Sequence, residues 1–145
     1  MQLSEHFTLE EFLRSDRAKV RGIDNTPTPE IVENLKGLAE RMERVRVILG
    51  HPITILSGYR CSELNAAVGG SKKSAHMDGY ACDFVCPMFG SAELVARRLD
   101  SAGLVFDQLI FEQSWVHVSV DPRMRRVVMT AHFADGKASY TPGIA

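Results

Sequence analysis

The chain has 145 residues, of which 45% are hydrophobic and 24% are charged, enough apolar material to bury the core of one domain. Its 17 basic and 18 acidic residues give a formal net charge of -1, so it lacks the basic footprint of a nucleic-acid-binding protein. No apolar run approaches the roughly 20 residues of a membrane span. Residues 1–6 lack the basic and apolar regions of a signal peptide. We therefore expect one domain, residues 1–145, that stays in the cytoplasm of its host until another factor releases it.

The first third of the chain is predicted to be helical. A capping box at Thr8–Glu11 starts a short helix at Leu9. Thr28 caps a second, longer helix, which Gly50 ends. The apolar residues of this second helix recur every three or four positions and form one stripe that we expect to be buried: Ile31, Leu35, Leu38, Met42, Val45 and Leu49.

The rest of the chain is predicted to contain strands and two short helices. The strands are expected at Ile53–Leu56, Tyr80–Cys86, Gln108–Phe111, Trp115–Val120 and Val127–His132, with a short last one near Ser139–Tyr140. The helices are expected to run from Ser62 through Val68 and from Ser91 through Leu99, the second with Leu94, Val95 and Leu99 facing inward. This order predicts an α+β fold, a small, mainly antiparallel sheet with helices packed on one face and an open groove on the other.

The three cysteines, Cys61, Cys82 and Cys86, are an odd number, which argues against a complete disulfide framework. Residues four apart in a straight strand lie roughly 13 Å apart, so Cys82 and Cys86 cannot readily bridge each other. Metal binding by these thiols is an alternative, but a buried free thiol is the commoner role for such residues.

The most informative feature is a histidine and an aspartate seven residues apart, His76 and Asp83, with Gly79 between them and His117 further along the chain. Gly79 can supply a tight turn with positive φ that brings His76 back over the following strand. Two imidazoles and one carboxylate form a zinc-ligand set that leaves a fourth tetrahedral position for water. The pattern therefore predicts metal-assisted hydrolysis.

Strand alternation supports this set, because it places Asp83 beside small neighbours and His117 on the face opposite a row of valines: Val116, Val118 and Val120. Each residue also has an ordinary interpretation. A lone strand histidine is usually a satisfied structural residue, and an aspartate after a turn is usually a cap or a solvated charge.

The segment Ser74 to Asp83, followed by Trp115-Val116-His117, resembles the signature of the zinc D-alanyl-D-alanine carboxypeptidases and L-alanyl-D-glutamate endopeptidases that share the hedgehog/DD-peptidase fold. Ser57-Gly58-Tyr59-Arg60 resembles the substrate-binding segment of that family. The likeness extends from Phe7 to Tyr140 and is to the compact, single-domain members encoded by bacteriophages and prophages.

The resemblance implies that three residues bind Zn²⁺: His76, Asp83 and His117. It implies that Arg60 holds a substrate carboxylate or carbonyl, and that Ser74 hydrogen-bonds the substrate or a ligand residue. An ion pair that fixes its loop is the alternative role for Arg60. Trp115 is predicted to form a wall of the cleft, with a packed core indole as the alternative.

One position departs from the family pattern. The better-known members carry the acid/base carboxylate three residues before the last histidine, where this chain has Ser114. The nearest carboxylate is Glu112, five residues before His117, and in an unbroken strand this odd offset turns it to the wrong face. Glu112 is the candidate base if a bulge or turn at Gln113–Ser114 brings it round, and an exposed loop carboxylate otherwise.

These expectations describe a zinc-dependent peptidase that cuts the peptide part of bacterial peptidoglycan, as a monomeric phage endolysin. Either a carboxypeptidase or an endopeptidase activity fits the pattern. A non-catalytic cell-wall-binding or virion structural module that keeps the zinc fold is the alternative, and the Ser114 departure is the feature that favours it.

Overall fold

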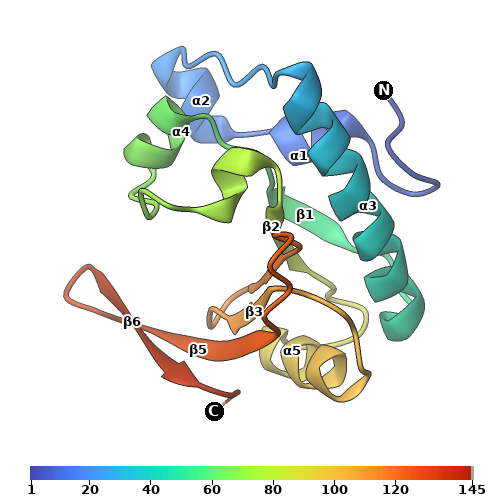
Figure 1. The fold of residues 1–145 in the computed structure, drawn as a ribbon. Helices are drawn as coiled ribbons and strands as arrows, with labels where there is room; N and C mark the ends of the chain where they lie inside the picture. The colour runs from blue at the N-terminus through green and yellow to red at the C-terminus, as the bar shows by residue number, and fades with distance from the viewer. Residues whose placement is uncertain (145) are drawn as a thin grey trace.

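A computed structural model describes residues 1–144 and shows an α+β fold in which helices pack against one side of a six-stranded sheet (Figure 1). The helices are α1 (Leu9–Leu13), α2 (Asp16–Arg21), α3 (Pro29–Leu49), α4 (Ser62–Ala67), the 3-10 helix η1 (Ala75–Asp78) and α5 (Ala92–Ser101). The strands are β1 (Thr54–Ser57), β2 (Ala81–Val85), β3 (Gln108–Phe111), β4 (Val116–Ser119), β5 (Val127–Ala134) and β6 (Lys137–Pro142). The predicted fold class is confirmed.

The strands lie in the order β1-β2-β4-β3-β5-β6. Every neighbouring pair is antiparallel except β3 with β5, which is parallel. The register pairs Asp83 of β2 with His117 of β4, and His117 with Ile110 of β3. Directly paired residues point to the same face of a sheet, so these three side chains share one face.

The opposite face of the sheet carries the core. Phe84, Val116, Val118 and Leu109 are completely buried there, and helix α3 packs its apolar stripe against the same core. The ends of α3 follow the prediction, because the Thr28 hydroxyl accepts a hydrogen bond from the Ile31 amide and Gly50 has a φ of 71°. Ile31 itself lies at the edge of the core and is partly buried.

Three local predictions were wrong or incomplete. Helix α2 was not predicted; Ser15 caps it, and its only buried residue is Ala18, so it shows little apolar periodicity. Helix α4 is capped by the Cys61 sulfur, one residue before the expected Ser62. In α5, Leu94 is 53% exposed although it was expected to face inward; Ala96 is buried instead.

The cysteine prediction is confirmed, since all three thiols are free and Cys82 and Cys86 are buried. Cys82 lies on the core face of β2, and burial raises the pKa of its thiol well above the usual value. None of the helices within residues 1–144 combines the length and apolarity that a bilayer crossing requires.

Candidate metal and catalytic site

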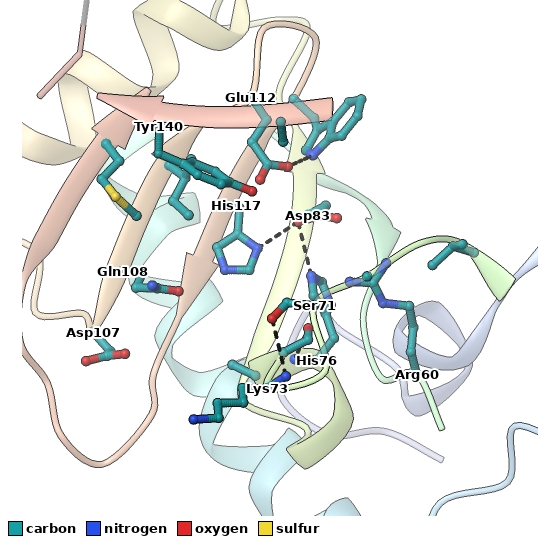
Figure 2. A pocket seen from close by; sticks show the side chains of 18 of the residues that line it. Arg60, Ser71, Lys73, His76, Asp83, Asp107, Gln108, Glu112, His117 and Tyr140 are labelled. Carbon is teal, nitrogen blue, oxygen red and sulfur yellow. Dashed lines mark hydrogen bonds and ion pairs between the residues drawn. The ribbon is translucent and has the colours of Figure 1, made fainter. Parts of the chain in front are cut away.

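Three side chains converge on the polar face of the sheet, at the junction of η1, β2 and β4 (Figure 2). His76 Nε2 lies 3.3 Å from Asp83 Oδ1, and His117 Nδ1 lies 3.0 Å from the same oxygen. One potential ligand atom from each residue falls within 4.8 Å of the others. The structure thus brings together the two histidines and the aspartate that the sequence pattern singled out.

Local structure explains how His76 reaches its place. The Ser74 hydroxyl caps η1 by accepting a hydrogen bond of 3.2 Å from the His76 amide. Gly79 ends η1 with a φ of 75°, the left-handed conformation predicted for it, so that the chain turns into β2. Ser74 also lines the pocket, and its role towards a substrate stays a prediction.

The orientation of the His76 ring is fixed by a backbone carbonyl. Its Nδ1 lies 2.7 Å from the Gly58 oxygen, to which it donates a hydrogen bond, and this leaves Nε2 as the acceptor that faces Asp83. A glycine is required at position 58, because a Cβ there would lie 2.5 Å from the Phe12 carbonyl oxygen. The predicted substrate-binding segment therefore also orients a ligand residue.

The electrostatics of the three residues suit a divalent cation. Burial lowers the pKa of His76, although the charge of Asp83 opposes this effect. Burial works to raise the pKa of Asp83, but the two histidines outweigh it and hold the carboxyl below its usual range. For His117, burial lowers the pKa and the hydrogen bond to Asp83 overcomes it, so the net pKa is raised. The neutral His76 imidazole and the ionised Asp83 carboxylate match the donors that Zn²⁺ prefers, and a bound cation would displace the proton that Asp83 favours on His117.

A two-residue turn resolves the odd offset of Glu112. The Glu112 amide donates to the Trp115 carbonyl at 3.0 Å, and Gln113 between them has a φ of 66°. Because the chain reverses here, Glu112 continues β3 two positions beyond Ile110 and lies on the same face as Ile110 and His117. The turn at Gln113–Ser114 that Glu112 requires to face the site is therefore present.

The carboxylate of Glu112 lies in the same pocket as the three potential ligands. Its Oε2 accepts a hydrogen bond from the indole Nε1 of Trp115. Burial and the charge of Asp83 raise the pKa of Glu112, while His117 and Trp115 oppose the shift. Trp115 lines the pocket and also orients this carboxylate, with its ring 6.3 Å from that of Phe133, and its contact with a substrate stays a prediction.

Arg60 approaches the site from the loop after β1. Its amide donates to the His76 carbonyl at 3.1 Å, and the Asn25 side chain holds both of its neighbours by bonding the Tyr59 carbonyl and the Cys61 amide. The guanidinium is largely buried, and its Nε has no hydrogen-bond partner within residues 1–144. Burial lowers the pKa of Arg60, but a guanidinium keeps its proton at neutral pH. Because Asn25 fixes the loop, the Arg60 side chain is not needed for that task and remains available to bind a substrate.

The cavity around these residues has a volume of about 550 Å³. Its lining includes residues that the sequence did not single out for the site: Lys73, Gln108, Arg125, Met129, Phe133 and Tyr140. Arg125 is held by the buried carboxylate of Asp107 through two hydrogen bonds of 2.9 Å. Tyr140 belongs to a strand that was predicted, but nothing in its spacing connects it with residues of β2 or β4.

The family model described as Peptidase M15 matches residues 5–119. This segment contains all three potential ligands, Arg60 and Glu112, and it ends with β4, so β5 and β6 lie beyond it. A search of curated proteins found no significant match.

Proposed function

The chain belongs to the peptidase M15 family, a family of zinc metallopeptidases, and from this premise we propose that it hydrolyses a peptide bond in bacterial peptidoglycan. The observation that carries the proposal is one cavity that holds a His-Asp-His cluster, a carboxylate with a raised pKa and a partly buried arginine that makes no ion pair within residues 1–144. Metal binding, proton transfer and recognition of an anionic substrate require these three kinds of group.

His76, Asp83 and His117 are the residues that would hold the zinc ion. When bound, zinc lowers the pKa of water and polarises a carbonyl oxygen. The chain contributes the orientation of its ligands: the Gly58 carbonyl fixes the His76 ring, and the pairing of β2 with β4 sets Asp83 beside His117. All ligands come from one chain, which is consistent with a monomer.

Glu112 is the residue that would move the proton. Its carboxylate accepts a proton from the attacking water and passes it to the nitrogen of the leaving amine. The Trp115 indole holds one carboxylate oxygen, which leaves the other towards the cavity. The raised pKa brings the carboxyl nearer to the pH at which it can both take and return a proton.

Arg60 would bind a carboxylate of the substrate. Its guanidinium presents a planar fork of donors that matches a carboxylate, and peptidoglycan stem peptides carry such groups. The Ser74 hydroxyl keeps its own proton for a second hydrogen bond to the substrate, since it accepts from the His76 amide. Trp115 supplies an aromatic wall beside these polar groups.

The narrower proposal is a phage endolysin that reaches the cell wall after its release from the host cytoplasm. It is supported by the likeness to compact phage and prophage members, which extends along the chain from Phe7 to Tyr140. The alternative is a wall-binding or virion structural module without turnover, for which the serine at position 114 was the motivating observation.

Digestion of purified sacculi tests the proposal. Zinc-loaded protein should release peptide fragments, a chelator should stop the release, and added zinc should restore it. Mass spectrometry of the fragments would identify the cleaved bond and distinguish a carboxypeptidase from an endopeptidase. Binding to sacculi of several wall types without any new fragment would favour the structural module instead.

A further inference from the structure

The β5–β6 hairpin, residues 127–142, lies beyond the family match and still forms a wall of the cavity. It joins the sheet through the parallel pairing of β5 with β3, at the side where Glu112 follows β3. Met129, Phe133, Ala138 and Tyr140 from the hairpin line the cavity. The catalytic pocket is therefore completed by a segment outside the matched region.

The register of the hairpin explains why Tyr140 can reach the site. Tyr140 pairs with Ala131, a fully buried residue with a small side chain, so no bulky neighbour stands across from the phenol ring. The Gln113 side chain donates to the Ala131 carbonyl at 2.7 Å, which ties β5 to the turn that follows Glu112. In Figure 2 the Tyr140 ring lies over the pocket and its hydroxyl points towards the carboxylates of Glu112 and Asp83.

The Tyr140 hydroxyl is suited to donate a hydrogen bond. Burial raises the pKa of Tyr140, and the negative charges of Glu112 and Asp83 raise it further, so the phenol keeps its proton at neutral pH. Within residues 1–144 the structure records no hydrogen bond made by the hydroxyl. Half of the side chain is exposed, at 50%, so the ring is a wall of the pocket and not part of the core. A protonated, unengaged phenol in a peptidase pocket is available to the substrate.

Resting on the proposed peptidase function, we propose that Tyr140 is a catalytic residue whose hydroxyl donates a hydrogen bond to the scissile carbonyl oxygen as that oxygen becomes negatively charged. When the water oxygen bonds to the carbonyl carbon, the π electron pair of the C=O bond moves onto the carbonyl oxygen. The pair returns when the C–N bond breaks, and the proton taken by Glu112 goes to the leaving nitrogen. Tyr140 keeps its own proton throughout and acts only through the hydrogen bond.

The test compares Tyr140→Phe with Tyr80→Phe in the zinc-loaded protein. Tyr80 lies against the core and outside the cavity lining, so its variant removes a phenol hydroxyl without touching the site. The substrate is a soluble peptide containing the bond that wild type cleaves in sacculi. We expect Tyr140→Phe to keep its zinc and its KM within about twofold while kcat falls about a hundredfold, as when one oxyanion donor is removed. Tyr80→Phe should behave as wild type.

Binding of a phosphinate analogue gives a readout that does not depend on turnover. Its tetrahedral oxygens imitate the charged carbonyl oxygen, so Tyr140→Phe should weaken its binding by about the same factor as kcat. A kcat within about threefold of wild type, or a rise in KM alone, would overturn the proposal. Wild type that is inactive on sacculi would instead overturn the peptidase function itself, so the two failures are distinguishable.

Discussion

The two faces of strands β2 and β4 differ as much as any two regions of this molecule. On one face, Cys82, Phe84, Val116 and Val118 are buried in the core under α3 and α5. On the other, the paired residues Asp83 and His117 form the floor of a polar cavity. The core face excludes water through apolar contacts, whereas the polar face carries charged groups that hold one another beside a cavity.

This difference assigns separate tasks to alternate residues of the same strands. The core face holds the strands in register, and the register in turn sets Asp83 beside His117. Buried ionisable groups are costly to a fold unless they are paired, and here a metal cation would complete the pairing. Substitutions on the polar face should therefore change metal binding and turnover, whereas those on the core face should change stability.

The largest expected effect comes from the polar face. His76→Ala should lower the zinc content from about one ion per chain to near zero and abolish hydrolysis, since it removes one of only three ligands. Asp83→Asn, which keeps the size of the side chain, should have the same effect. Elemental analysis of the purified variants measures it, with His132→Ala on the exposed part of β5 as the control. Stoichiometric zinc in folded His76→Ala would refute the ligand assignment.

Glu112→Gln tests the separation of metal binding from proton transfer. The variant should keep its zinc and its fold, because Glu112 is not among the three ligands, while kcat falls by about a hundredfold to ten-thousandfold. Steady-state kinetics would measure the loss. Glu93→Gln, which removes an exposed carboxylate on α5, is the matched control and should leave the rate unchanged. Wild-type turnover in Glu112→Gln would mean that the base lies elsewhere.

Phe84→Ala tests the apolar face directly. Phe84 is fully buried beside Asp83 in sequence but on the opposite side of β2. Truncation should lower the free energy of unfolding by about 3–5 kcal/mol, measured by urea denaturation. Leu94→Ala should change it by less than about 0.5 kcal/mol, because that side chain is 53% exposed. Zinc loss without a change in stability in Phe84→Ala would contradict the division between the two faces.

Arg60→Ala should give the smallest effect and one confined to substrate recognition. We expect kcat/KM to fall about tenfold, from the loss of one charged hydrogen bond, and Tm to stay within a few degrees because Asn25 fixes the loop. Arg97→Ala, on the exposed side of α5, is the control. A large drop in Tm at unchanged kcat/KM would indicate a structural role for Arg60.

The parts of the fold that depend on local sequence were predictable. Three features depend on residues that are close together in the sequence, and each is present in the structure: the capping box at Thr8–Glu11, the apolar stripe of α3 and the alternation in β4. Helix α2 was not predicted because so short a helix with one buried residue shows almost no periodicity of apolar residues in the sequence. Leu94 was placed wrongly because the buried face of α5 is formed by Val95, Ala96 and Leu99, and Leu94 lies outside it.

The parts of the site that depend on long-range packing were not predictable. Asn25 lies 34 residues from Tyr59 and still holds the Arg60 loop, and no spacing rule connects them. Tyr140 lines the same cavity as Glu112 because β5 pairs with β3 in parallel, a pairing that the predicted, mainly antiparallel sheet did not specify. Glu112 faces the site because of the turn at Gln113–Ser114. The sequence indicated that a turn was needed there, but it did not predict the backbone geometry of that turn.

Zinc-edge X-ray absorption of the loaded protein tests the central claim most directly, because it identifies the atoms around the metal. The account predicts one zinc per chain, bound by two imidazoles and a carboxylate with nitrogen and oxygen neighbours at about 2.0–2.2 Å and no sulfur. A sulfur neighbour at about 2.3 Å would contradict it, since Cys82 and Cys86 are buried in the core, Cys61 packs against the core, and the cluster contains none of the three thiols.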